Sequence, residues 1–282
     1  MTTKEYYLPQ SLDEALSLLN KHGDALMLMA GGTLAMPLIN EGVSLPEMVL
    51  GLRQAGLNTL SQSNGVFKIG SMTTYSQLLD YEPGIPLLKE AARNIGGWAI
   101  RNMGTIGGNL FAPPPSGDFA VALLALDAKL TLAGAGGIRR LPISEFFTGF
   151  MTNALKAREI VTEIEVPVPS GKTAYLKFGR KQGNTPAIVS IAVHLEFSGS
   201  IVSDARIALN AVGPHPFRAT NSEAVLIGKE LNQASISAAA AAAEQACSPF
   251  SDPIASEWYR RKMVSVQMHR ILARVADGGN HA

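Results

Sequence analysis

Residues 101–118 read RNMGTIGGNLFAPPPSGD, and a shorter relative, LMAGGTL, stands earlier in the chain at residues 28–34. In both stretches a glycine pair lies beside a small polar residue, where an apolar run meets a turn. Glycine has no Cβ, so it adopts positive φ readily and lets main-chain N–H groups approach a bound group closely. We call residues 28–34 the first glycine loop and residues 105–109 the second glycine loop. The pattern predicts a backbone shaped to lie against a ligand.

The polar residues beside the glycines indicate an anionic or polyol ligand. Thr33 and Asn109 carry short hydrogen-bonding side chains, which suit phosphate oxygens and sugar hydroxyls. A stiff run of three prolines then leads to Asp118, whose carboxylate can accept hydrogen bonds from hydroxyl groups. Two alternatives stay open: each glycine pair can be an ordinary turn, and Asp118 can cap a helix that begins at Phe119. Neither loop matches the Walker or the GxGxxG pattern.

Composition excludes several classes of protein. A chain of 282 residues with 46% hydrophobic residues has room for two domains, each with its own core. A net charge of +1 without a basic stripe argues against a nucleic-acid surface. The single cysteine, Cys247, excludes an internal disulfide and any metal cluster held by several thiolates of this chain, and we expect it to be buried.

The start of the chain, MTTKEYYLPQ, has neither a basic segment nor an apolar core of the signal-peptide type. No window approaches the roughly 20 apolar residues that a membrane span needs. We therefore expect a cytoplasmic protein.

Periodicity and capping signals predict a series of helices and strands in the first 170 residues. Capping boxes are expected at Ser11 with Glu14 and at Thr74 with Gln77, and Thr33 is placed to cap a segment that begins at Leu34. The glycine-rich residues 101–109 interrupt the helical pattern. Further helices are expected at residues 86–95 and 120–126, and strands at 25–29, 48–50, 66–69 and 159–168, with a hairpin at 129–132 turned by the glycines of 134–137.

The last third changes character after Gly171, which is the best candidate for a domain boundary. Three strands at residues 174–178, 187–197 and 201–212 predict an antiparallel meander. Helices are expected to follow at residues 235–246 and 254–276. The chain is therefore expected to be an α+β protein.

Taken in order, these features resemble the FAD-binding medium subunit of the molybdenum hydroxylases, the family that contains carbon monoxide dehydrogenase and xanthine dehydrogenase. The resemblance covers essentially the whole chain. It rests on Tyr7-x-Pro9 with residues 11–15, Ala30-Gly31-Gly32-Thr33, Arg101-Asn102-x-x-Thr105-Ile106-Gly107-Gly108-Asn109, Asp118, residues 160–167, and Lys177 with Arg180.

The resemblance implies a fold and a division of the chain. A two-subdomain FAD-binding domain of the vanillyl-alcohol-oxidase and CO-dehydrogenase flavoprotein type would comprise residues 1–58 and 59–170. Residues 171–282 would then form a CO-dehydrogenase-flavoprotein-like C-terminal domain, an antiparallel three-stranded sheet with a helical bundle.

The resemblance also assigns cofactor-binding residues. The first loop would lie along the FAD pyrophosphate, the second would form the opposing clamp, Asp118 would bind cofactor hydroxyls, and Val161 would approach the cofactor through its main chain. Lys177 would lie beside the isoalloxazine and raise its potential, unless it is an ordinary exposed strand lysine. The full set is Met29, Ala30, Gly31, Gly32, Thr33, Leu34, Thr105, Ile106, Gly107, Gly108, Asn109, Asp118, Val161 and Lys177. Residues 98–100 and Asn184-Thr185-Pro186 depart from the family pattern, so the flavin surroundings can differ there.

The resemblance implies that this chain transfers electrons from its partner subunits to an acceptor. Substrate would be oxidised at a molybdenum cofactor in a large partner subunit, electrons would pass through 2Fe-2S clusters of a small partner subunit, and this chain's FAD would deliver them to an acceptor. The assembly would be a dimer of heterotrimers, a heterohexamer. This chain would need no catalytic side chain and no metal ligand. Two alternatives are a self-sufficient flavin-dependent oxidoreductase that acts directly on an organic substrate and a non-catalytic nucleotide-binding module.

Overall fold

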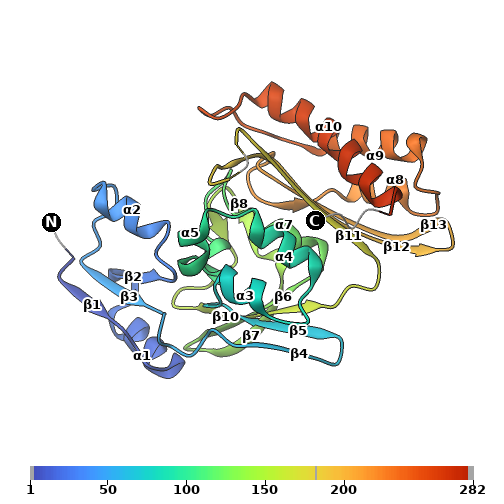
Figure 1. The fold of residues 1–282 in the computed structure, drawn as a ribbon. Coiled ribbons are helices and arrows are strands. Elements are labelled where there is room, and N and C mark those ends of the chain that lie inside the picture. Colours follow the sequence, from blue (N-terminus) through green and yellow to red (C-terminus); the bar gives the residue numbers. More distant parts are fainter. Residues whose placement is uncertain (1–2, 182, 279–282) are drawn as a thin grey trace.

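The computed structural model describes residues 3–181 and 183–278 and divides into three parts (Figure 1). The first part is a small parallel sheet in the order β1 (Glu5–Tyr7), β3 (Met48–Gly51), β2 (Leu26–Met29). Helix α1 (Leu12–His22) begins at Ser11, whose hydroxyl accepts from Glu14 N and so satisfies one free donor of the first turn. A short helix, α2 (Ala35–Asn40), follows the first glycine loop.

The second part is a five-stranded sheet in the order β4 (Leu60–Ser63), β5 (Val66–Gly70), β10 (Ile160–Pro167), β6 (Lys129–Gly134), β7 (Gly137–Pro142). The helices that belong to it are α3 (Tyr75–Asp80), α4 (Pro86–Arg93), α5 (Trp98–Met103), α6 (Ile106–Asn109) and α7 (Phe119–Ala125). Every residue of α7 is buried. A small hairpin of β8 (Phe147–Gly149) and β9 (Thr152–Asn153) completes this part.

The third part is an antiparallel sheet in the order β11 (Lys172–Gly179), β12 (Ala187–Ser198), β13 (Ile201–Asn210), β14 (Phe217–Arg218). Helices α8 (Thr220–Leu226), α9 (Gln233–Ala246) and α10 (Glu257–Ala276) cover one face, while α4 and α7 lie against the other (Figure 1). Because both faces are covered, most of β12 is buried, and its sequence is a nearly continuous apolar run instead of an alternating one.

The two faces of this sheet belong to different cores. Tyr175, Ala192 and Ala208 pack into the core of the second part, whereas Ala174, Val193 and Ile207 pack with α9 and α10. The third part is therefore joined to the second through a shared apolar layer. That layer holds strand β11 beside the glycine loops.

Most of the predicted elements are confirmed, including the hairpin of β6 and β7, the long strand β10, the antiparallel order of β11, β12 and β13, and the capping box of Thr74 with Gln77. Helix α4 ends at Arg93 and does not continue into residues 101–109, which contain the end of α5 and the single turn α6, two short helices that were not predicted. The short strand β14 adds a fourth member to the predicted three-stranded meander.

Two predicted caps are wrong in detail. Thr33 does not cap α2, which begins after Leu34 without a side-chain cap. Glu14 does not close a capping box with Ser11, because its carboxylate accepts from Gln10 N instead.

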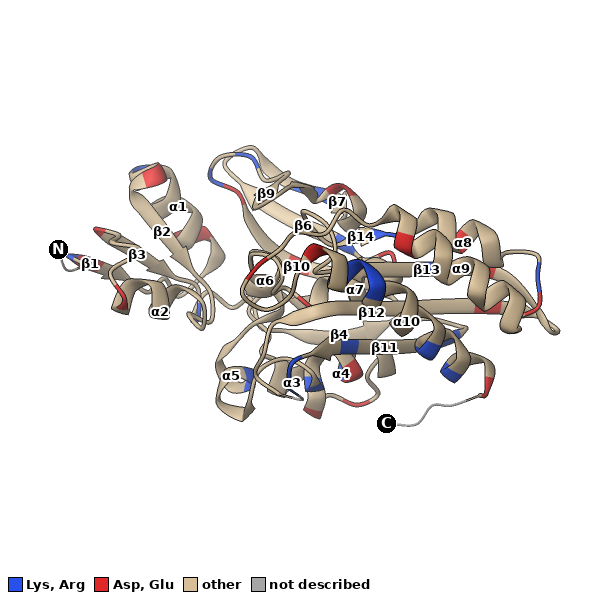
Figure 2. Cartoon of the chain, turned by 90° about the horizontal axis from the view of Figure 1, so that it is seen from above, with Lys and Arg blue, Asp and Glu red and all other residues tan. Residues whose placement is uncertain are grey.

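Charge is spread over the molecule. Lysine and arginine (blue) and aspartate and glutamate (red) occur in each of the three parts, as Figure 2 shows. Among the described residues, no helix is both long enough and apolar enough to cross a membrane.

Candidate functional site

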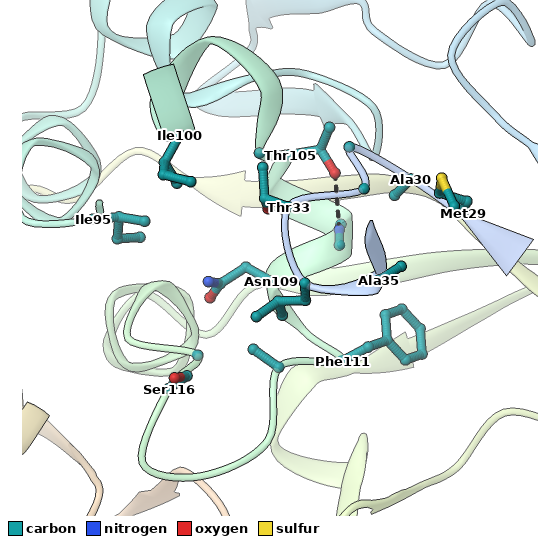
Figure 3. A pocket seen from close by; sticks show the side chains of 18 of the residues that line it. Met29, Ala30, Thr33, Ala35, Ile95, Ile100, Thr105, Asn109, Phe111 and Ser116 are labelled. Carbon is teal, nitrogen blue, oxygen red and sulfur yellow. Dashed lines mark hydrogen bonds between the residues drawn. The ribbon is translucent and has the colours of Figure 1, made fainter. Parts of the chain in front are cut away.

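A cavity of about 640 Å³ lies where the three parts meet, and all but one of the predicted site residues line it. The exception is Ile106, which is fully buried in the core of the second part. In the second glycine loop, Thr105, Gly107, Gly108 and Asn109 line the cavity, and the side chain of Ile106 packs into the core beside them. Figure 3 shows the side chains of Thr33, Thr105 and Asn109 gathered around this space.

The first glycine loop lines the cavity and has main-chain donors without a partner among the described residues. It leaves β2 after Met29, and Gly32 adopts φ +74°, a conformation that glycine reaches without strain. The N–H groups of Gly31, Gly32 and Thr33 make no hydrogen bond with any residue in the described part of the chain. Consecutive N–H groups of this kind form a site for an anion.

The second glycine loop is built differently. It forms the single helical turn α6, and its N–H groups already have partners inside the protein. The N–H groups of Ile106 and Gly107 donate to the carbonyls of Thr73 and Ser71, at 2.9 and 2.8 Å. Gly108 N donates to the Thr105 hydroxyl at 3.1 Å, the dashed line in Figure 3. The N–H groups of this loop are thus engaged within the protein, and its role as the opposing clamp for a ligand stays a prediction.

The two loops touch each other. A Cβ placed on Gly31 would lie only 2.0 Å from the carbonyl oxygen of Met103, just before the second loop. A Cβ placed on Gly108 would lie 3.2 Å from the Cβ of Ala30. The glycines are needed because the loops pack this closely, and the cavity opens beside their contact.

Asp118 is buried in the cavity wall, and its carboxylate is not used to cap α7. The residue is 4% exposed. The N–H of Phe119, the first residue of α7, donates to Asn109 Oδ1 at 3.0 Å. Asp118 therefore stands at the N-cap position of α7, as the alternative expected, but its side chain makes no capping hydrogen bond. One carboxylate oxygen, Oδ1, accepts from Ser190 Oγ at 2.9 Å and Asn210 Nδ2 at 3.3 Å.

The other carboxylate oxygen of Asp118 pairs with Lys177 on β11. Lys177 Nζ lies 2.8 Å from Asp118 Oδ2 and also donates to the carbonyl of Asn94 at 3.2 Å. The Lys177 side chain is only 10% exposed, so the alternative of an ordinary exposed strand lysine is wrong. The third part of the chain thus contributes a charged group to the cavity.

Val161 lies near the start of β10, at the irregularity in its pairing with β6. Val161 and its neighbour Ile160 are both buried and line the cavity. Glu159, directly before Ile160, also lines the cavity. Its carboxylate accepts two hydrogen bonds from the Arg139 guanidinium, from Nε at 2.8 Å and from Nη2 at 2.7 Å. Those hydrogen bonds lower the pKa of Glu159 below its ordinary value.

Several lining residues were not predicted from the sequence. Tyr75 is the first residue of α3 and is 2% exposed, and burial raises the pKa of its phenol, so it stays neutral. Apolar walls come from Ile95, Ile100 and Phe111. The signal that could have found Tyr75 is its position directly after the Thr74 cap, which fixes it at a helix start beside the loops. Nothing in the sequence marks the three apolar residues as lining a cavity.

Both of these departures from the family pattern reach the cavity. Asn184, Thr185 and Pro186 line it, and so does Ile100 at the end of residues 98–100. Trp98 does not line the cavity and is 75% exposed on α5.

The cavity is equipped for binding. Among its lining residues only Asp118, Glu159, Lys177 and Tyr75 have ionisable side chains, and both carboxylates are already paired. Cys247 is buried, and its pKa is raised to about 12, so it is a neutral thiol away from the cavity. The described residues contain no cluster of three or more His, Cys, Asp or Glu side chains that could hold a metal ion.

Comparison with known proteins covers nearly the whole chain. Residues 2–169 match the model of the FAD binding domain in molybdopterin dehydrogenase, and residues 173–275 match that of the CO dehydrogenase flavoprotein C-terminal domain. The glyceraldehyde dehydrogenase medium chain of Sulfolobus acidocaldarius is 35% identical over 96% of this chain and 98% of its own length. The carbon monoxide dehydrogenase medium chain of Hydrogenophaga pseudoflava is 33% identical over 95% of both chains.

A solved structure agrees with the sequence relatives. A chain of the Cu,Mo-CO dehydrogenase in its cyanide-inactivated form superposes with a TM-score of 0.93 at 31% identity. The match covers 99% of this chain and 100% of the other.

Proposed function

Because this chain belongs to the family of FAD-binding medium subunits of the molybdenum hydroxylases, we propose that it carries electrons between two partners through a bound FAD. It would take them from 2Fe-2S clusters of a small subunit and pass them to an external acceptor. The observation that carries this proposal is the set of unpartnered N–H groups of Gly31, Gly32 and Thr33 beside the cavity.

The cavity residues fit such a cofactor part by part. The diphosphate would lie against the first glycine loop, whose free N–H groups supply hydrogen-bond donors, while the glycines of the second loop keep space for it. Thr33 and Thr105 offer hydroxyl groups, and Asn109 offers an amide, to the same part of the cofactor.

The two ends of the cavity suit the two ring systems. Tyr75, Ile95 and Ile100 provide apolar walls on the side where Lys177 offers a donor and Asp118 an acceptor, which suits the flavin ring with its imide edge. On the other side, Ile160 and Val161 would lie against the adenosine, with Val161 using its main chain. When bound, FAD supplies the reversible redox step, and the protein holds it in place and shields it.

The partners are proposed from an apolar surface beside the cavity. Helices α2 and α5 contain no buried residue. These helices, and Leu34 directly before α2, carry exposed apolar side chains, which we call the mouth patch: Leu34, Met36, Leu38, Trp98 and Met103. Exposed apolar side chains that gather on a surface mark interaction sites. We propose that the small iron–sulfur subunit covers the mouth patch, that a large subunit carries the molybdenum cofactor, and that two such heterotrimers associate.

The division of the chain into residues 1–58, 59–170 and 171–282 is part of the same proposal, as is a cytoplasmic location. The first two parts would enclose the diphosphate and adenosine, and the third would complete the flavin pocket through Lys177 on β11.

The experiment uses the purified chain under anaerobic conditions. We expect a visible spectrum with oxidised-flavin bands, one FAD per chain, and bleaching of those bands by the chemically reduced small iron–sulfur subunit. Candidate organic substrates added without that subunit should leave the bands unchanged. Direct bleaching by a substrate would instead support a self-sufficient flavin oxidoreductase, and a chain that does not bind FAD would support a nucleotide-binding module.

A further inference from the structure

Asp118 and Lys177 form a buried ion pair in the cavity wall. Its two side chains are 5% and 10% exposed, and Nζ lies 2.8 Å from Oδ2. At that distance and burial, each charge strongly offsets the field of the other. A ligand in the cavity therefore meets a nearly neutral pair at this point, whereas the sequence predicted a single positive charge beside the flavin.

The hydrogen bonds of the pair leave little free capacity. The Lys177 ammonium has three donors, of which Asp118 and the Asn94 carbonyl take two. The Asp118 carboxylate has about four acceptor positions, and Ser190, Asn210 and Lys177 use three of them. One donor of Lys177 and one acceptor position of Asp118 remain, and both residues line the cavity.

The partners of Asp118 fix its place. Ser190 and Asn210 are paired across strands β12 and β13, on the sheet face that packs against α7, and Asp118 directly precedes α7. The carboxylate is thus held between the second and third parts of the chain. It cannot leave Lys177 without breaking the contacts to both strands.

We propose that Asp118 is a positioning residue that compensates the charge of Lys177 and so keeps the reduction potential of the bound FAD lower than Lys177 alone would set it. This inference rests on the proposed function, because it requires FAD in this cavity with its ring beside Lys177. Reduction adds negative charge to the flavin, so an uncompensated ammonium favours the reduced cofactor and an uncompensated carboxylate opposes it.

The proposal predicts that the two single variants shift the midpoint potential of the bound FAD in opposite directions. Asp118→Asn leaves Lys177 uncompensated and should raise the midpoint potential of the FAD-loaded chain. Lys177→Gln leaves Asp118 uncompensated and should lower it. We expect each change to alter the ratio of the affinities for oxidised and reduced FAD at least tenfold, which is about 30 mV for a two-electron couple. The double variant Asp118→Asn/Lys177→Gln should return close to the wild-type potential.

The measurement is a dye-equilibrated redox titration of the purified, FAD-loaded chain, with circular dichroism to verify folding. For a variant that binds FAD weakly, the ratio of the affinities for oxidised and reduced FAD is obtained directly from the two dissociation constants, and it replaces the redox titration. If Asp118→Asn does not fold, Asp118→Ala and the double variant carry the test. Glu165→Gln is the matched control, because it removes a carboxylate paired with Lys68 and Arg140 that does not line the cavity, and its potential should equal that of wild type.

Two results would overturn the inference while leaving the proposed function intact. One is FAD bound to Asp118→Asn with an unchanged or lower potential. The other is a double variant whose potential falls as far as that of Lys177→Gln, which would mean that Lys177 acts on the flavin as a single charge. Failure of the wild-type chain to bind FAD would instead contradict the proposed function itself.

Discussion

The two glycine loops have different roles, although glycine allows close packing in both: Gly31 lies against the Met103 carbonyl, and Gly108 lies against Ala30. Only the first loop leaves the N–H groups of its glycines without a partner among the described residues. The sequence alone predicts the two loops but cannot distinguish these roles. The carbonyls that occupy the second loop's N–H groups come from Ser71 and Thr73, about thirty residues earlier, and no local pattern indicates them.

Gly31 tests the contact between the loops. Gly31→Ala places a Cβ 2.0 Å from the Met103 carbonyl oxygen, so the backbone has to move. We expect a loss of about 1–3 kcal/mol of unfolding free energy and weaker FAD binding, measured by denaturant titration and flavin fluorescence. Gly136→Ala is the control, because nothing lies within 4 Å of its added Cβ. Equal stability and equal FAD affinity in the two variants would show that the loops do not pack as described.

Asn109 tests the cap of α7. Its Oδ1 accepts the Phe119 N–H, and Asn109→Ala leaves that buried donor without a partner. We expect a loss of about 1 kcal/mol of unfolding free energy, measured by urea denaturation of the FAD-free chain. Asn58→Ala, at an exposed position, should change it little. A stability loss no larger than that of the control would mean that Asn109 does not stabilise α7.

At the scale of elements, strong periodicity and capping signals made most strands and several helices predictable, but the short helices α5 and α6 were missed. Residues 101–109 contain three glycines, which disfavour helix by propensity, yet Thr105 caps α6 and the contact of Tyr75 N with the Gly104 carbonyl ties the turn to α3. Tertiary contacts outweigh propensity there. The hydrogen bonds of Asp118 with Ser190 and Asn210 could not be predicted from the sequence either, because they depend on how β12 and β13 pack against α7.

The mouth patch tests the role of α2 and α5. Trp98→Gln removes a large exposed apolar side chain that does not line the cavity. We expect at least tenfold weaker association with the small iron–sulfur subunit and unchanged FAD affinity, measured by calorimetry with each ligand. Trp258→Gln, on α10, is the matched control, because that residue is also exposed, at 68%. Unchanged association in Trp98→Gln would place the docking surface elsewhere.

At the scale of the whole molecule, Glu159 links stability to pH. Arg139 lowers the pKa of the Glu159 carboxyl in the folded state, so its stabilising effect is present above the unfolded pKa of about 4.3 and is lost as pH falls through the lower folded pKa. Glu159→Gln should therefore unfold about 1 kcal/mol more easily than wild type near pH 6. The difference should shrink at more acidic pH.

The measurement is urea denaturation of the FAD-free chain across this pH range, with exposed Glu145→Gln as control. A stability difference between wild type and Glu159→Gln that does not change with pH would contradict the role of the Arg139 pair.

The account as a whole depends on one contact, that between the first glycine loop and the cofactor diphosphate. A crystal structure of the purified chain with FAD tests it most directly. We expect diphosphate oxygens within hydrogen-bond distance of the N–H groups of Gly31, Gly32 and Thr33, and none bonded to the N–H groups of residues 106–108. A diphosphate bound away from the first loop, or a cavity that excludes FAD, would contradict the account.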